Sequence, residues 1–244
     1  MSSRRLEILR AIVDEYVATQ EPVGSKSIAD RHGLGISPAT IRNEMAVLED
    51  EGLITQPHTS AGRIPTDLGY RVFVDKLATV KPLSTAERRA IETFLEGSNN
   101  LDELLKKSAK LLADITKQVA VVTYPVLGDA PNREKMAISG TAHLARSGEN
   151  LGFTLSPILE ALEEQVVLLS LLNEANQTVQ VRIGQEQNEQ NFWATSLVTV
   201  GYGTSESSHG GLGVLGPTRM DYAGSIAAVD AVARYVGRFI KEGA

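Results

Sequence analysis

The N-terminal part of the chain contains a stretch with clear structural signals, SPATIRNEMAVLEDEGLITQPHTSAGRIPT at residues 37–66. Ser37 has the side chain of a helix cap, and Pro38 suits the first helical position, where its missing N–H would have no partner in any case. Gly52 ends the predicted helix, because glycine readily takes the backbone that closes a helix. Short β-prone runs on both sides of residues 57–62 then predict a hairpin. A capped helix followed at once by a hairpin is typical of the second half of a winged helix-turn-helix.

The residues before this stretch complete the motif. Ser3–Thr19 places its apolar residues at spacings of three and four, which predicts a helix with one buried face. Ser25 is expected to cap a short second helix that ends near Arg31, and the glycine-rich residues 32–35 form a turn. Helix, short helix, turn, capped helix and hairpin within about 65 residues is the order of a winged helix-turn-helix.

The rest of the chain predicts a second domain that mixes helices and strands. Thr66 is expected to cap a helix that leads to a linker at residues 79–82, and capping spacings at Ser84 and Asn100 open two more helices. The other predicted elements are strands at Val119–Tyr124, Thr178–Ile183, Ala194–Val200 and Gly213–Leu215, with helices at Pro157–Asn173 and Gly224–Ile240. Residues 127–150 show no assignable pattern. The predicted fold class is α+β, with a winged helix-turn-helix domain at residues 1–80 and a second domain at residues 81–244.

Composition limits the classes of function. The 244 residues include 24 Lys and Arg against 30 Asp and Glu, a net charge of −6, which argues against indiscriminate binding to a polyanion. Any contact with nucleic acid must therefore come from a local patch. Cysteine is absent, which excludes disulfides and thiolate metal sites. No long apolar run is present, and charges interrupt the first 17 residues, so we expect a cytoplasmic protein without a secretory signal.

The predicted helix after Ser37 has the features of a helix that reads DNA. A helix in the major groove presents small polar and bidentate side chains near its N-terminus, and Thr40, Arg42 and Asn43 meet that need. Arginine suits guanine and asparagine suits adenine. DNA phosphates could bind at the N-termini of the helices. The hairpin could contact the DNA backbone, or its Arg63 could enter the minor groove. The predicted DNA-binding residues are Ser25, Lys26, Ser37, Thr40, Arg42, Asn43, Thr59 and Arg63.

Other interpretations of the chain are weaker. The same trihelical pattern could serve as a protein-interaction module with an ordinary solvated face. The sequence lacks the residue patterns of common enzyme sites, because the four histidines are scattered and no nucleophile elbow or P-loop is present. Gly211, Gly213 and Gly216 match the G-x-G-x-x-G dinucleotide pattern, but the residues after them suffice for only one helix. We expect a tight strand-to-helix packing turn there, and no cofactor, metal or catalytic residue.

Two groups of residues resemble one family of bacterial regulators. Ser37–Met45, with His58–Thr66 and Gly69–Arg71, is similar to the N-terminal domain of the heat-inducible transcription repressor (HrcA) family. Gly211–Tyr222 resembles the C-terminal signature of that family, and Ala161–Glu164 also matches. The resemblance covers residues 3–78 and about 137–240.

This resemblance implies a sequence-specific repressor of chaperone operons. Members bind an inverted-repeat operator as homodimers, are kept active by a GroEL-type chaperonin, and carry a GAF-like domain after the winged helix. The chain departs from the family around residues 125–136, where members have many more residues, so the GAF-like domain is expected to be shortened. Either the short form is natural or an internal segment has been lost. The alternative function is a chaperone- or ligand-binding regulatory module with weak DNA binding.

Overall fold

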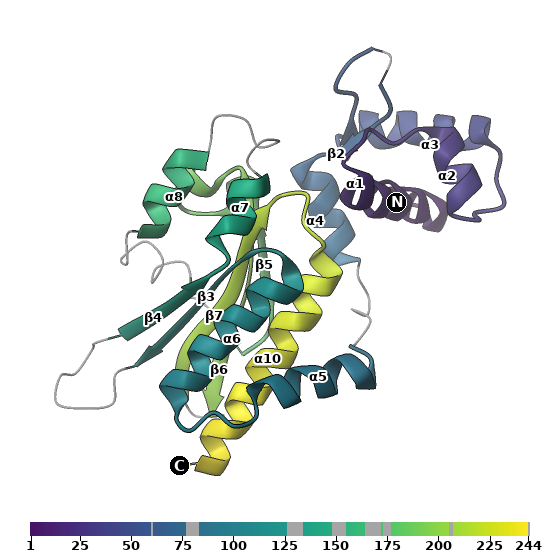
Figure 1. Cartoon of the computed structure of the whole chain (residues 1–244). Coiled ribbons are helices and arrows are strands. Elements are labelled where there is room, and N and C mark those ends of the chain that lie inside the picture. Colours follow the sequence, from purple (N-terminus) through teal and green to yellow (C-terminus); the bar gives the residue numbers. More distant parts are fainter. Residues whose placement is uncertain are drawn as a thin grey trace. The chain divides into compact units, whose positions relative to one another are not determined.

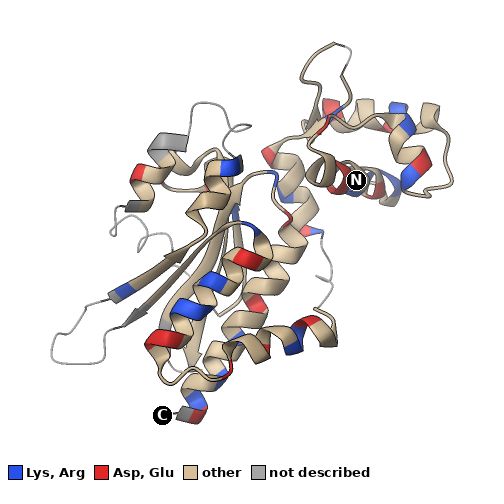
Figure 2. Cartoon of the chain, viewed as in Figure 1, with Lys and Arg blue, Asp and Glu red and all other residues tan. Residues whose placement is uncertain are grey.

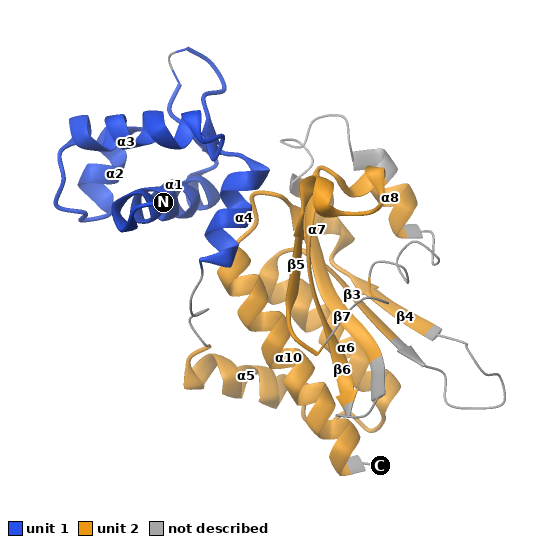
Figure 3. Cartoon of the chain, turned by 180° about the vertical axis from the view of Figure 1, so that it is seen from behind, with its two compact units in different colours: residues 1–78 blue, residues 79–244 orange. Residues whose placement is uncertain are grey.

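The computed structural model describes residues 1–59, 61–76, 83–125, 134–147, 155–163, 172, 177–204 and 207–243. The chain divides into two compact units, residues 1–78 and residues 79–244 (Figure 3). The predicted linker at residues 79–82 lies outside the described residues.

Unit 1 has the element order predicted from the sequence (Figure 1). Its elements are α1 (Ser3–Thr19), α2 (Ser25–Arg31), α3 (Pro38–Asp50), β1 (Ile54–Thr55), β2 (Ile64–Pro65) and α4 (Asp67–Asp75). The caps at Ser37 and Thr66 are confirmed, since each side chain accepts a bond from a backbone N–H of the first helical turn. The cap predicted at Ser25 is wrong. Gly24 takes the extended backbone of the cap position, and Ser25 is the first helical residue and is buried.

The core of unit 1 forms where the apolar stripes of its helices meet. On α3, Ile41, Met45 and Leu48 are buried, as their spacing predicts. α3 contacts α1 and α2, and α4 contacts α1. The buried residues of these other helices include Ile8, Leu9 and Ile12 of α1, Ile28 of α2, and Tyr70 and Phe73 of α4. Each fully buried aliphatic side chain contributes about 1.5–3 kcal/mol, so this shared core holds α3 against the rest of the unit.

The predicted hairpin, or wing, has two strands of two residues each. β1 and β2 pair antiparallel, with Ile54 opposite Pro65. Its base is fixed by a second contact, because Val23 and Arg63 exchange two backbone hydrogen bonds of 2.9 and 2.8 Å. Gly62 makes this approach possible, since a Cβ there would lie 2.5 Å from the Val23 carbonyl oxygen. The wing is therefore attached to the segment between α1 and α2.

Unit 2 confirms a fold that mixes helices with a sheet. Its elements are α5 (Thr85–Leu95), α6 (Leu101–Thr116), β3 (Val119–Pro125), β4 (Glu134–Ser139), α7 (Thr141–Ser147), α8 (Leu155–Glu163), β5 (Gln180–Ile183), the short 3-10 helices η3 (Gly184–Glu186) and η4 (Gln190–Phe192), β6 (Thr195–Thr204), β7 (Ser207–Pro217) and α10 (Tyr222–Gly243). The described strands form an antiparallel sheet in the order β4-β3-β7-β6-β5.

Helices cover both faces of this sheet. α6 and α10 lie side by side across one face (Figures 1 and 3). On the other face, Val121, Leu197 and Leu215 form a buried cluster with Leu144 of α7 and Ile158 of α8. Alternate residues of the central strands thus point to opposite helix layers, which explains why these strands read as continuous apolar runs.

Several elements of unit 2 differ from the sequence predictions. The glycine pattern at residues 211–216 lies inside β7, so the predicted strand-to-helix turn at that place is wrong. The strand carries glycine where neighbours crowd it, since a Cβ on Gly213 would lie 2.6 Å from the Val198 carbonyl oxygen. The turn follows at residues 218–220. β4 and α7 occupy part of the stretch without an assignable pattern, and the end of the predicted helix at Pro157–Asn173 falls largely outside the described residues.

Candidate nucleic-acid interface

The start of α3 is fixed by its own cap. The Ser37 hydroxyl accepts a 3.1 Å bond from the backbone N–H of Thr40, and the two hydroxyls lie 3.0 Å apart. Pro38 occupies the first turn without an N–H to satisfy. Thr40 is therefore half-buried and held by Ser37, and the positive end of the helix dipole opens at this cap.

The outer face of α3 carries two exposed polar side chains, Arg42 and Asn43, that make no hydrogen bond or ion pair with other described residues. Ala39 and Ala46 are also exposed, and their small side chains would let the helix come close to another surface. Five arginine donors and an amide therefore stand free on a face lined by small residues, which is what bidentate reading of base edges requires.

Arginines from other elements neutralise the glutamates of α3. Arg5 of α1 places Nε 2.8 Å from Glu44 Oε2 and Nη1 3.0 Å from Glu51 Oε1. The hydrogen bond to Glu44 is the largest cause that raises the pKa of Arg5 above its ordinary value. Arg63 pairs with Glu49 in the same way, at 2.8 Å. Asp50, in the last turn, has no such partner among the described residues. Most of the negative charge on the helix is thus compensated inside unit 1.

The remaining predicted residues lie in different surroundings. Lys26 is exposed on α2, and Thr59 is exposed on the wing, where its backbone oxygen accepts a 3.0 Å bond from Gln56 Nε2. Ser25 is only 9% exposed, and Arg63 is held at the base of the wing by Glu49. The structure therefore brings Ser37, Thr40, Arg42 and Asn43 together on α3 and does not leave the Arg63 side chain free.

A buried carboxylate fixes α2 against α1. Glu15 of α1 is 8% exposed and accepts a hydrogen bond from the Ser27 hydroxyl. Arg31 Nη1 lies 3.6 Å from its carboxylate and His32 Nε2 lies 3.3 Å from it. A buried charge is stable only with such partners. No local sequence pattern marks this cluster or the ion pairs of the α3 glutamates, because the partners are 12 to 46 positions apart.

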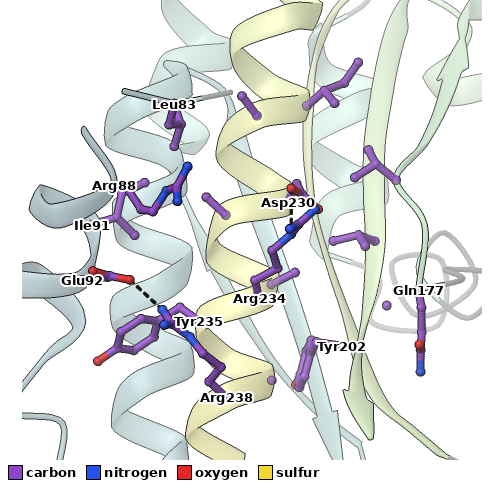
Figure 4. Close-up of a pocket in the computed structure, with 18 of the residues that line it drawn as sticks. Leu83, Arg88, Ile91, Glu92, Gln177, Tyr202, Asp230, Arg234, Tyr235 and Arg238 are labelled. Carbon is purple, nitrogen blue, oxygen red and sulfur yellow. Dashed lines mark hydrogen bonds and ion pairs between the residues drawn. The ribbon is translucent and has the colours of Figure 1, made fainter. Parts of the chain in front are cut away.

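Unit 2 contains a groove that no pattern in the sequence predicts. It has a volume of about 1140 Å³ and lies along α10, with α5 on one side and β6 and the residues just before β5, Gln177 and Val179, on the other (Figure 4). Apolar side chains such as Ile91 and Val200 line it, together with the cations Arg88, Arg234, Arg238 and Lys241. Asp230 pairs with Arg234 at 3.0 Å, and Glu92 pairs with Arg238 at 2.6 Å. Arg88 and Lys241 have no ion-pair partner among the described residues.

Charge is otherwise dispersed. Figure 2 shows acidic and basic residues interspersed along the helices of both units. Within the described ranges, no three His, Cys, Asp or Glu side chains are grouped as a metal site requires. The helices found there are also too short or too polar to cross a membrane.

Two protein families match the chain, one within each of its two units. Residues 1–78 match the family described as a winged helix-turn-helix transcription repressor, HrcA DNA-binding. Residues 126–226 match the family described as the HrcA protein C terminal domain.

Two curated relatives align with nearly the whole chain. Both are described as the heat-inducible transcription repressor HrcA and are 43% identical to this chain. The relative from Nocardioides sp. covers 98% of this chain and 99% of its own length, and the relative from Streptomyces avermitilis covers 99% of each. These alignments run over 333 and 336 residues against the 244 of this chain, so the relatives carry residues that have no counterpart here.

A solved structure shares the fold. It is the crystal structure of a hypothetical protein that is 20% identical to this chain, with a TM-score of 0.85 and full coverage of both chains.

Proposed function

The chain belongs to the HrcA family of heat-inducible transcription repressors, and we propose that it acts on chaperone operons by binding an inverted-repeat operator as a homodimer. That it is a DNA-binding repressor of heat-shock genes, and not an enzyme, follows from the family. The observation that carries the proposed mode of binding is the outer face of α3, where Arg42 and Asn43 stand free while the glutamates of the helix are paired.

We propose that α3 enters the major groove with its N-terminal half. Arg42 then binds a guanine edge and Asn43 an adenine edge, with Thr40 beside them. Lys26, Ser37 and Thr59 contact the backbone, because all three are exposed on unit 1. Ser25 contributes at most through its backbone, since its side chain is buried.

The proposed homodimer follows from the symmetry of the operator. An inverted repeat has a two-fold axis, so two copies of the reading helix must be related by a two-fold axis as well. We assign unit 2 to dimerisation and regulation as a shortened GAF-like domain, which its antiparallel sheet with helices on both faces supports. A GroEL-type chaperonin is the proposed partner that keeps the repressor active, as the family implies.

Fluorescence anisotropy tests this proposal on three labelled duplexes: the inverted repeat that precedes the chaperone operon of the source genome, a single half-site, and a scrambled duplex. Measurements at two salt concentrations separate specific from electrostatic binding. Tight binding to the full repeat, well above the half-site and scrambled duplexes, is the expected result. Equal and weak binding to all three would contradict the proposed dimeric repressor.

The groove along α10 favours a second candidate function, a ligand- or chaperone-binding regulatory module. Its volume slightly exceeds that of ordinary small-molecule sites, and it combines apolar walls with the unpaired cations Arg88 and Lys241. Such a lining suits an amphipathic acid. Native mass spectrometry of the purified chain tests this function: a retained compound whose mass disappears in the Arg88→Ala variant supports it, and a bare protein mass in both argues against it.

A further inference from the structure

We propose that Arg63 is a positioning residue for operator recognition, which holds the reading helix through Glu49 and does not itself contact DNA. The proposal rests on the proposed function of α3 and names a residue on which that function depends. It replaces the minor-groove role that the sequence suggests for this arginine.

The ion pair occupies the guanidinium. Arg63 Nε lies 2.9 Å and Nη2 lies 2.8 Å from the same carboxylate oxygen of Glu49. The side chains of Arg63 and Glu49 are 22% and 33% exposed, so the pair is partly shielded from water. Two hydrogen bonds to one carboxylate fix the orientation of the planar guanidinium, so the pair has a defined geometry. A guanidinium engaged in this way would have to break both bonds before it could enter a minor groove.

The backbone of the same residue is fixed independently. Arg63 exchanges two hydrogen bonds with Val23, in the segment between α1 and α2, and Gly62 allows that approach. Arg63 is thus the point where three parts of unit 1 meet: its backbone joins the wing to the α1–α2 segment, and its side chain joins both to α3.

Glu49 lies on the side of α3 that reads DNA. Arg42 and Glu49 are seven residues apart, which corresponds to about two helical turns and returns to nearly the same face. The Arg63 contact therefore restrains the stripe that contains Arg42, about two helical turns away from that predicted base contact. It also neutralises a carboxylate that would otherwise face phosphates. Removing both charges together distinguishes positioning from neutralisation. If the pair positions α3, the double variant loses specificity; if Arg63 only neutralises Glu49, the double variant keeps it.

The decisive variant is Arg63→Met combined with Glu49→Gln, because it removes the ion pair and leaves the net charge of unit 1 unchanged. Its control is Arg71→Met combined with Asp75→Asn, which removes a 3.1 Å pair within α4. Affinity of the full chain is measured by anisotropy on the inverted-repeat and scrambled duplexes across a salt series. We expect the first variant to lose about threefold to tenfold in the ratio of the two affinities with an unchanged salt slope, and the control to behave as wild type.

Two results would overturn the proposal. A salt slope reduced by about 0.9 per half-site would show that Arg63 neutralises a phosphate itself. A wild-type affinity ratio in the double variant would show that the pair positions nothing. If wild type itself does not distinguish the two duplexes, the proposed function of α3 fails instead, so the two failures are distinguishable.

The conservative variant Arg63→Lys covers the case in which the double variant does not fold. Lysine keeps the positive charge but cannot form the forked contact with Glu49. The single variant Glu49→Gln, which keeps the whole guanidinium of Arg63, should lose the affinity ratio as well. Loss in both variants at an unchanged salt slope supports positioning, whereas a wild-type ratio in either variant contradicts it.

Discussion

Replacing Arg42 by alanine should weaken binding to the operator at one base pair per half-site and leave binding to scrambled DNA nearly unchanged. In the free protein the Arg42 side chain has no bond to other described residues, so DNA binding breaks no internal contact and the full recognition energy is available. A bidentate contact between arginine and guanine discriminates by about 1–3 kcal/mol. Because 1.4 kcal/mol corresponds to a tenfold change in affinity, the expected loss is about 5- to 140-fold per half-site.

The assay is anisotropy on a set of operator duplexes, each with one base pair replaced symmetrically in both half-sites. Wild type should lose affinity at every position that it reads. The Arg42→Ala variant should be indifferent at one of those positions, and Asn43→Ala at a different one, because each variant lacks the side chain that reads the base.

The matched control is Arg10→Ala, which removes an exposed arginine of the same unit from α1. It changes the charge of unit 1 by the same amount and should keep the wild-type pattern. Equal loss on operator and scrambled duplexes for Arg42→Ala would refute the assignment of α3 as the reading helix.

Three further outcomes follow from the structure. Lys26→Ala should weaken binding to all duplexes alike and reduce the salt slope by about 0.9 per half-site, as salt titration would show; an unchanged slope would exclude a phosphate contact. Gly62→Ala should destabilise the protein by about 1–3 kcal/mol in urea unfolding, because its Cβ would lie 2.5 Å from the Val23 oxygen, whereas Gly24→Ala meets nothing within 4 Å. His143 has a pKa lowered from 6.5 by burial, and by Arg146 and Lys117, so protonation favours the unfolded state. Its contribution should be complete above pH 6.5 and decline as the pH falls below that value, and His143→Asn should flatten this part of the stability curve; the same slope in both proteins would contradict the assignment.

Local signals in the sequence were sufficient for the elements whose geometry is decided within a few residues. Ser37 caps α3 because its side chain reaches a backbone N–H three positions later, and the same distance governs Thr66 and Asn100. The apolar spacing of α3 also identifies its buried face, since the helix period alone sets which residues share a side. The two groups of residues that resemble the repressor family are likewise local, and the family followed from them.

The other features of the fold and of the candidate site depend on contacts between residues that are far apart in the sequence. The glycine-rich residues 211–216 are compatible with a turn or a strand, and only pairing with β3 and β6 makes them the middle strand of a sheet. Arg63 was predicted to contact the DNA backbone or the minor groove, whereas folding places Glu49 within 3 Å of its guanidinium, and Val23 against its backbone. The reason is physical: a cap or a helix period acts over three or four residues, whereas ion pairs, buried carboxylates and grooves depend on which helices and strands the folded core brings together.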